Sequence, residues 1–449
     1  MKKLFGTDGI RAVAGQTPLD APTIYAIGLA LAHSLAAAFA SPRVVLGMDT
    51  RESGGWIATT LTAGLKAGGA SVESAGVITT PAIAFLTRTH GFAAGIVISA
   101  SHNPWQDNGI KVFGADGYKL PDATEIAIEE EIFRRLADAG SPTIEQSGPP
   151  EVNESDRADY VRFLLAAVPG LSLDGKRIVI DCANGAASAV APQLFAGLGG
   201  ELLITHASPD GRNINENCGA LHPEIVAAQV KVQGASMGIT FDGDADRALF
   251  ADEHGCVVNG DAVLLLAARD LQARGLLTNS TIVATTMSNM GLEAALKRSG
   301  IQMLRAAVGD KYVLEQMIST GAALGGEQSG HIIFTGRGTT GDGLLTALLL
   351  LDIVHRSGKT LSELVADLKV FPQVIVNVKV REKRPLDTIP AVVAAILSAE
   401  QELADCGRVV IRYSGTEALA RVMIEAESEP LMRHHAGAIA EAIRAELGV

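Results

Sequence analysis

The 449-residue sequence predicts an α/β protein made of several domains. Short runs of β-branched residues alternate with longer Ala- and Leu-rich stretches of helical period, which is the pattern of strands alternating with helices. Hydrophobic residues make up 47% of the chain but aromatic residues only 4%. Cores built from small aliphatic side chains are typical of helices packed on parallel or mixed sheets. At about 100–200 residues per domain, the length predicts two to four domains.

The first cycle of strands and helices fills the N-terminal third of the chain. β-Branched and apolar runs predict strands at 43–48, 71–78 and 95–99. Longer stretches of helical period predict helices at 56–66 and 81–89. The Ala-rich segment 28–40 begins too late for a signal sequence and is expected to be a packed helix.

The same rhythm restarts twice and then changes. The second cycle predicts a strand at 176–182, a helix ending at 198, and strands at 238–241 and 247–251 around an acidic turn. The third predicts a helix at 261–276, a strand at 281–286 and a helix from 291. After Phe371-Pro372, alternating residues predict strands at 374–380, 408–412 and 421–427, with helices at 389–404 and 431–447.

Candidate domain boundaries follow from these restarts and from Gly- and Pro-containing junctions. We expect three α/β domains of similar topology and a smaller C-terminal α+β domain, at 1–152, 153–254, 255–370 and 371–449. Similar units packed edge to edge would leave a central cleft between them.

Charge and cysteine content narrow the function classes. A net charge of −13 argues against a general nucleic-acid binder, although a few clustered cations can still hold a phosphorylated small molecule. The four cysteines, Cys182, Cys218, Cys256 and Cys406, have neither zinc-site nor disulfide-framework spacing. The apolar run 344–354 is too short to cross a bilayer and contains Asp352. We therefore expect a cytoplasmic protein with reduced thiols.

The most specific motif is the acidic stretch TFDGDADR. Asp242, Asp244 and Asp246 alternate with small residues directly after an apolar strand. Three converging carboxylates repel one another unless a cation lies between them, and an all-oxygen set favours Mg²⁺ or Mn²⁺. The alternative is a solvated acidic turn. Phosphate is the usual further ligand of such a cation.

Two other turns carry groups suited to a sugar phosphate. The sequence GEQSGH at 326–331 offers a carboxylate, an amide, a hydroxyl and an imidazole, which suit sugar hydroxyls, although an ordinary polar turn has the same composition. The segment 412–417, RYSGTE, with Arg421 nearby, combines two arginines with backbone N–H groups and predicts a phosphate cradle or a simple hairpin turn. The N-terminal turn at 5–11, FGTDGIR, is a weaker signal that ends in Arg11.

A strand at 95–99 breaks into the turn SASHNP, where serine and histidine are adjacent. A Gly-x-Ser-x-Gly elbow is missing, and neighbouring side chains usually diverge, so a direct relay between Ser101 and His102 is not expected. A serine at a strand end, with three carboxylates elsewhere, suits phosphoryl transfer better. Lys111 is then an acid/base group or a cation facing the transferred group, unless it is a plain surface lysine.

Taken together and in this order, the motifs resemble the α-D-phosphohexomutase family over essentially the whole chain. Within it, the sequence is most similar to the bacterial phosphoglucosamine mutase subfamily. Gln328 stands where related phosphomannomutases and phosphoglucomutases typically have Met. The sequence departs from the family pattern at Ala12, at Ala220-Leu221 and at Ala418, which leaves loop shape and sugar preference less secure than the reaction class.

The resemblance implies roles for individual residues. Ser101 would be the phosphoserine, and its phosphate would complete a Mg²⁺ site made by Asp242, Asp244 and Asp246. The residues linked to acid/base work or to the transferred phosphoryl group would be Lys111, His331, Arg11 and Arg247. Those contacting the sugar or its other phosphate would be Glu327, Ser329, Arg412, Ser414, Gly415, Thr416 and Arg421.

The implied reaction interconverts glucosamine 6-phosphate and glucosamine 1-phosphate through a phosphoserine enzyme and a 1,6-bisphosphate intermediate, supplying amino-sugar nucleotide and cell-wall precursor synthesis. One Mg²⁺ per active site and a hexose or hexosamine 1,6-bisphosphate activator go with it. A phosphomannomutase or phosphoglucomutase, or an inactive sugar-phosphate-binding protein, are the alternatives. We expect the partner to be a small phosphosugar and neither a nucleic acid nor a membrane. The sequence leaves the oligomeric state open, with a homodimer as the candidate.

Overall fold

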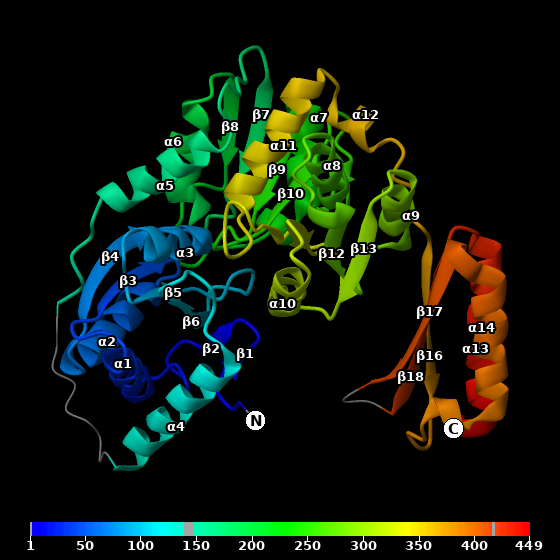
Figure 1. Cartoon of the computed structure of the whole chain (residues 1–449), viewed down its shortest axis with the longest axis horizontal. Coiled ribbons are helices and arrows are strands. Elements are labelled where there is room, and N and C mark those ends of the chain that lie inside the picture. The colour runs from blue at the N-terminus through cyan, green and yellow to red at the C-terminus, as the bar shows by residue number, and fades with distance from the viewer. Residues whose placement is uncertain (1, 139–147, 415–417) are drawn as a thin grey trace. The chain divides into compact units, whose positions relative to one another are not determined.

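The computed structural model describes residues 2–138, 148–414 and 418–449 (Figure 1). Its contacts divide the chain into two compact units. The first unit runs up to Thr286 and includes Leu304–Val365, and the second comprises Met287–Met303 and Ala366–Val449. Among the described helices, none is long and apolar enough to cross a membrane.

The first sheet of unit 1 has six strands in the order β1-β2-β6-β5-β3-β4, drawn in blue to cyan in Figure 1. Its strands are β1 Phe5–Gly6, β2 Gly9–Val13, β3 Arg43–Met48, β4 Ser71–Val77, β5 Ala94–Ile98 and β6 Asp107–Gly114. Strands β3, β4 and β5 are parallel, whereas β6 is antiparallel to β5. Its helices are α1 Ala21–Ala36, α2 Gly54–Ala67, α3 Thr80–Thr89 and α4 Asp122–Asp138. Helices α1, α2 and α4 share one apolar core with the sheet.

The second sheet has five strands in the order β11-β10-β9-β7-β8. They are β7 Arg177–Asp181, β8 Glu201–Thr205, β9 Met237–Phe241, β10 Ala248–Ala251 and β11 Val257–Val258. Strands β7, β8 and β9 are parallel, and β10 returns antiparallel to β9. The accompanying helices are α5 Ser155–Ala166, α6 Ala187–Ala196 and α7 Pro223–Gln233. The apolar side chains of α7 pack on β7 and β10.

The third sheet has four strands in the order β13-β12-β14-β15. They are β12 Thr281–Thr285, β13 Gln302–Ala306, β14 Leu324–Gly326 and β15 Ile332–Phe334. Strand β14 is parallel to β12 and antiparallel to β15. The helices of this region in unit 1 are α8 Gly260–Ala273, α10 Asp310–Thr320, α11 Gly343–Ser357 and α12 Leu361–Val365, whereas α9 Met290–Arg298 belongs to unit 2.

The three sheets share one feature that positions the functional loops. In each, a buried parallel strand is followed by a short loop and an antiparallel partner: β5 by β6, β9 by β10, and β14 by β15. These loops carry Ser101, the acidic triad and His331 respectively. Each motif therefore occupies the carboxyl end of a parallel strand, which is where α/β sheets usually place their ligands.

Unit 2 contains a three-stranded antiparallel sheet in the order β16-β18-β17. Its strands are β16 Gln373–Lys379, β17 Gly407–Tyr413 and β18 Leu419–Ala426. The apolar sides of α13 Pro390–Leu403 and α14 Glu429–Leu447 pack on this sheet and form a core of their own. The two helices lie together beside the strands in Figure 1.

The predicted strands and helices are present, and apart from the Ala-rich helix their ends lie within three residues of the prediction. The expected helix 261–276 stops at Ala273, because Gly275 turns the chain with a left-handed φ of 68°. The Ala-rich helix spans Ala21–Ala36 and not 28–40. It begins early because Asp20 accepts a hydrogen bond from the N–H of Thr23, which caps the helix.

Candidate active site

The loop after β5 is held in a defined shape around Ser101. The backbone of Ser101 adopts a left-handed φ of 52°, which is uncommon for a non-glycine residue. Its N–H donates to Ser99 Oγ (2.9 Å), and Ser99 in turn donates to Asp49 Oδ2 (2.6 Å). Its carbonyl accepts from Arg51 Nη2 (2.9 Å) and from Asn215 Nδ2 (3.0 Å). Ser99 is therefore scaffold, and the hydroxyl of Ser101 is left for other partners.

The Ser101 hydroxyl points at the acidic loop between β9 and β10. Its Oγ donates to Asp242 Oδ2 at 2.6 Å, across 141 positions of sequence. The three carboxylates of Asp242, Asp244 and Asp246 are buried and place ligand oxygens within 4.8 Å of one another. Among the described residues, Oδ1 of Asp244 and Oδ1 of Asp246 have no hydrogen-bond partner. Orphaned buried carboxylate oxygens are costly, so the triad fits a bound cation.

Electrostatics within the triad support the same reading. Burial, together with the charges of Asp246 and Asp244, raises the pKa of Asp242 well above its usual range. Burial would also raise the pKa of Asp246, but Lys111 and His331 hold it below its usual value. A divalent cation among the oxygens would offset the repulsion that these carboxylates impose on one another. Oxygen ligands of this charge suit Mg²⁺ better than Zn²⁺.

Lys111 is not a surface lysine. It lies in β6, is 1% exposed, and its Nζ lies 2.8 Å from Asp244, 2.9 Å from Asp8 and 3.6 Å from Asp246. Burial alone would lower the pKa of Lys111, but the carboxylates of Asp244 and Asp8 raise it above its usual value. A positive charge therefore lies directly beside the triad.

His331 reaches the same carboxylates from the loop between β14 and β15. Its Nδ1 lies 3.5 Å from Asp246 Oδ2, and its Nε2 accepts from the N–H of Gly341 (3.0 Å). Burial would lower the pKa of His331, but Asp246 raises it above its usual value. In the same loop, Glu327 Oε1 accepts from the N–H of Gly309 (3.1 Å), while Ser329 is exposed.

Arg11 and Arg247 bring positive charge to the Ser101 loop. Within the described part of the chain, the buried Nε groups of both arginines have no hydrogen-bond partner, which leaves them as donors. Burial and the charges of Arg247 and Arg11 lower the pKa of His102 to about 4, so both guanidinium groups act on the residue next to Ser101. Charge-assisted donors of this kind suit phosphate oxygens.

One expectation about this loop is wrong. Ser101 Oγ and His102 Nδ1 do not diverge but lie 3.3 Å apart, in a loop where Ser101 has a left-handed backbone. The contact with Asp242 is shorter, at 2.6 Å.

The predicted phosphate cradle lies in unit 2. Arg412 on β17 and Arg421 on β18 are directly paired across the sheet, so their side chains share one face. Ser414 follows β17, and its carbonyl accepts from Lys383 Nζ (2.6 Å). Opposed like charges are destabilising unless an anion offsets them, which suits a phosphate. Gly415 and Thr416 lie outside the described residues.

Several residues that support the site have only a weak sequence signal or none. Asp49 and Arg51 form a buried ion pair at 2.9 Å. The guanidinium group of Arg51 also donates hydrogen bonds to four backbone carbonyls in and after the Ser101 loop, those of Ser101, Asn103, Pro104 and Asp107. Thr80 donates to Asp244 from the start of α3. The DTR tripeptide after β3 was the one available signal for the ion pair. No pattern along the chain indicates the role of Thr80.

Comparison with family models covers nearly the whole chain. Four models match, in order: phosphoglucomutase/phosphomannomutase alpha/beta/alpha domain I at 2–138, domain II at 158–255, domain III at 259–371 and the C-terminal domain at 375–442. The predicted four-domain α/β fold class and the predicted family are therefore confirmed.

Two similar bacterial proteins carry the same name. A protein of Koribacter versatilis named phosphoglucosamine mutase is 61% identical over all of this chain and 98% of its own length. A protein of Solibacter usitatus with the same name is 53% identical over all of this chain and 99% of its own length. The predicted similarity to the bacterial phosphoglucosamine mutase subfamily is confirmed.

Solved structures agree on the fold. A phosphoglucomutase/phosphomannomutase family protein of Burkholderia thailandensis is 25% identical, with a TM-score of 0.78 over all of both chains. The N-acetylphosphoglucosamine mutase of Aspergillus fumigatus, solved in complex with GlcNAc-6P and magnesium, is 20% identical with a TM-score of 0.60, covering 99% of this chain and 96% of that one. At that identity, the second likeness shows the fold alone.

Proposed function

The chain belongs to the phosphoglucomutase/phosphomannomutase family, and from that premise we propose that it interconverts glucosamine 6-phosphate and glucosamine 1-phosphate. The observation that carries the proposal is the 2.6 Å contact between Ser101 Oγ and Asp242 in a buried triad of aspartates. That contact supports Ser101 as the phosphate acceptor beside a candidate cation site. We further propose a cytoplasmic location and a small phosphosugar as the partner.

Ser101 is the residue that carries the phosphoryl group in this proposal. Asp242, Asp244 and Asp246 would hold Mg²⁺, with an oxygen of the Ser101 phosphate as the further ligand. When bound, Mg²⁺ would neutralise charge on the transferred phosphoryl oxygens. Arg11 and Arg247 supply buried Nε–H donors to the same oxygens.

The two transfers balance in protons and bonds. In the first, the bond from phosphorus to Ser101 Oγ breaks as phosphorus bonds a sugar hydroxyl oxygen, giving a 1,6-bisphosphate. The hydroxyl loses a proton and Ser101 gains one. Lys111 and His331 are the groups beside the triad that we assign to these two proton movements. The second transfer returns the other phosphoryl group to Ser101.

The remaining predicted residues bind the unreacting parts of the substrate. Glu327 and Ser329 are assigned to sugar hydroxyls. The paired arginines Arg412 and Arg421, with Ser414, Gly415 and Thr416, are assigned to the phosphate that is not being transferred. A hexose or hexosamine 1,6-bisphosphate is proposed as the activator that phosphorylates Ser101.

The first test concerns the serine. Wild-type enzyme treated with glucose 1,6-bisphosphate should gain the mass of one phosphoryl group, and Ser101→Ala should lose both this gain and mutase turnover. Ser99→Ala is the matched control: it removes the hydroxyl that positions the loop but should still be phosphorylated. Full turnover in Ser101→Ala would overturn the assignment.

The second test separates the substrates. Coupled assays should give a higher kcat/KM for glucosamine 6-phosphate than for glucose 6-phosphate or mannose 6-phosphate, with turnover rising when the bisphosphate activator is added. A preference for mannose or glucose phosphates would favour the phosphomannomutase or phosphoglucomutase alternative. Binding of these sugars without turnover would favour an inactive sugar-phosphate-binding protein.

A further inference from the structure

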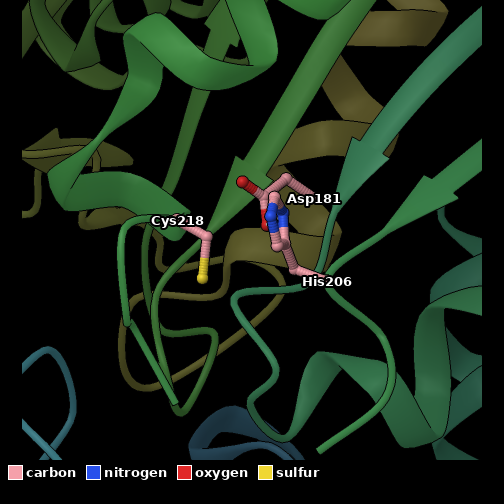
Figure 2. Close-up of side chains that lie close together, drawn as sticks. All are labelled: Asp181, His206 and Cys218. Atoms are coloured by element: carbon pink, nitrogen blue, oxygen red, sulfur yellow. The ribbon is translucent and has the colours of Figure 1, made fainter. Parts of the chain in front are cut away.

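A second cluster of metal-binding side chains lies in the domain of the second sheet, and it shares no residue with the carboxylate triad. Asp181 ends β7, His206 follows β8, and Cys218 precedes a short turn at Gly219. One potential ligand atom from each residue lies within 4.8 Å of the other two. Figure 2 shows Asp181 and His206 side by side, with Cys218 beside them on a separate loop.

The contact between Asp181 and His206 does not have the geometry of a hydrogen bond. His206 Nδ1 lies 3.1 Å from Asp181 Oδ1. Yet this nitrogen is a buried atom for which the described residues provide no hydrogen-bond partner. Two groups that approach closely without sharing a proton are arranged as ligands of one ion are.

Backbone hydrogen bonds fix the carboxylate of Asp181 in place. Oδ1 accepts from the N–H of Ala183 (2.9 Å), and Oδ2 accepts from the N–H of Gly219 (3.0 Å). The second of these bonds ties Asp181 to the residue directly after Cys218. The carboxylate and the thiol are therefore positioned together, as preorganised ligands should be.

The donor set identifies the kind of ion. One carboxylate oxygen, one imidazole nitrogen and one thiol sulfur are the ligands that Zn²⁺ accepts in proteins, whereas Mg²⁺ prefers oxygen alone. We propose that Asp181, His206 and Cys218 form a zinc site, with water as the fourth ligand. The side chain of His206 is 32% exposed, which gives the ion and the water a route in.

Binding would proceed by displacement of a proton. Zinc binds the thiolate form of cysteine, so the thiol of Cys218 must lose its proton when the ion binds. As the bond between sulfur and zinc forms, the thiol proton leaves to solvent. A carboxylate oxygen of Asp181 and Nδ1 of His206 complete the protein ligands.

A zinc ion at this site would stabilise the acidic loop between β9 and β10. A Cβ placed on Gly219 would lie 2.8 Å from the carbonyl of Phe241, and one on Gly185 would lie 2.3 Å from the carbonyl of Gly243. The two loops that flank the cluster thus pack tightly on the backbone that carries Asp242. An ion that joins the end of β7 to two loops here would stiffen the support of the triad without contacting the triad itself.

The test uses the full-length protein, from which a chelator has first removed bound metal ions. Saturating Mg²⁺ is then added so that the carboxylate triad is occupied and does not bind the added Zn²⁺. We expect one Zn²⁺ per chain by equilibrium dialysis. We also expect Co²⁺ at the same site to give the intense thiolate-to-cobalt absorption band that carboxylate and imidazole ligands lack. Cys218→Ser should abolish the band and weaken Zn²⁺ binding by more than about tenfold.

The controls separate this site from other thiols and from misfolding. Cys182→Ala removes a buried thiol next to Asp181 that is outside the cluster, and it should leave the band intact. His206→Ala changes a partly exposed position, so it should weaken Zn²⁺ binding while keeping the far-UV circular dichroism of the wild type. If Cys218→Ser fails to fold, Zn²⁺ binding by His206→Ala is the test of the proposed site. Absence of bound Zn²⁺, a Co²⁺ spectrum without the thiolate band, or wild-type affinity in His206→Ala would each overturn the proposal.

Discussion

At the scale of single residues, Lys111 does two things that can be separated. Its ammonium group lies 2.8 Å from Asp244 and 3.6 Å from Asp246, so it supplies positive charge where a metal ion would also supply it. It is also the buried cation that we assign to proton transfer. Loss of a positive charge beside the triad should change Mg²⁺ binding, whereas loss of a proton-transfer group should change turnover, so the two roles can be measured separately.

We predict that Lys111→Met lowers kcat by about 10²-fold or more while Mg²⁺ binds no more weakly than in the wild type. Turnover falls because an acid/base group typically contributes 10²–10⁴-fold. Mg²⁺ affinity is kept or increased because a competing cation has left the carboxylates. Isothermal titration with Mg²⁺ and a coupled mutase assay measure the two quantities.

Lys66→Met is the matched control, because Lys66 is exposed on α2, and it should change neither quantity. Circular dichroism establishes that the Lys111 variant is folded. Loss of Mg²⁺ binding together with turnover would mean that Lys111 acts by holding the triad in shape, and would contradict the assignment.

Some functional residues can be recognised from the sequence, whereas others can be recognised only in the folded structure. Asp242, Asp244 and Asp246 are visible because they alternate over five positions, and Ser101 because its motif ends a strand. Thr80 and the pairing of Lys111 with Asp8 arise only when distant segments meet, so no spacing indicates them. The Asp181, His206 and Cys218 cluster is of the second kind, since its members come from the end of β7 and from two separate loops.

At the scale of elements, the approach of α1 to α2 depends on glycine. A Cβ on Gly64 would lie 2.3 Å from the carbonyl of Tyr25, and one on Gly28 would lie 2.5 Å from the carbonyl of Leu61. No real Cβ contacts backbone at such distances, so the two helices would have to move apart. Their shared core also contacts β5, the strand that leads into the Ser101 loop.

We therefore predict that Gly64→Ala lowers the free energy of unfolding by about 1–3 kcal/mol, the usual cost of overpacking. Gly55→Ala, on the same helix, meets nothing within 4 Å and should be neutral or stabilising by at most about 1 kcal/mol. Urea unfolding followed by tryptophan fluorescence compares the two variants. Equal midpoints for both would show that the helices adjust without cost.

Element positions were predictable because strand and helix periodicity is strong in this chain. Element ends were less so: α8 stops at a left-handed glycine, and α1 starts at a cap, each a local backbone event. The recurring arrangement, in which a parallel strand is followed by a loop and an antiparallel strand, was not visible. It depends on strand pairing, which the sequence pattern does not specify.

At the scale of the whole molecule, the family models and the contacts divide the chain differently. Four models match in succession, whereas the contacts give two units, with Met287–Met303 grouped with the C-terminal part. A composition change marks the start of a new module but says nothing about which modules pack together. The boundaries at 152, 254 and 370 and the central cleft therefore stay predictions.

The assignment of the triad to unit 1 leads to a prediction about the stability of that unit. A ligand that binds only the folded state stabilises it by RT ln(1 + [L]/Kd), about 2.7 kcal/mol at a hundred times Kd. Both tryptophans of the chain, Trp56 and Trp105, lie in unit 1, so fluorescence reports its unfolding. We predict that Mg²⁺ raises the thermal midpoint of the fluorescence transition in chelator-treated protein, and that the rise saturates with Mg²⁺ concentration.

Asp244→Asn tests whether that stabilisation comes from the triad. The substitution keeps the size of the side chain but removes one of the three charges that draw the cation, so the midpoint of this variant should respond little to Mg²⁺. Without Mg²⁺, the thermal midpoint of Asp244→Asn should stay near that of the wild type or rise. The substitution loses the ion pair with Lys111, but it also removes one of three carboxylates that repel one another. An equal Mg²⁺-dependent rise in both proteins would place the stabilising cation elsewhere in the molecule and would contradict the triad as the magnesium site.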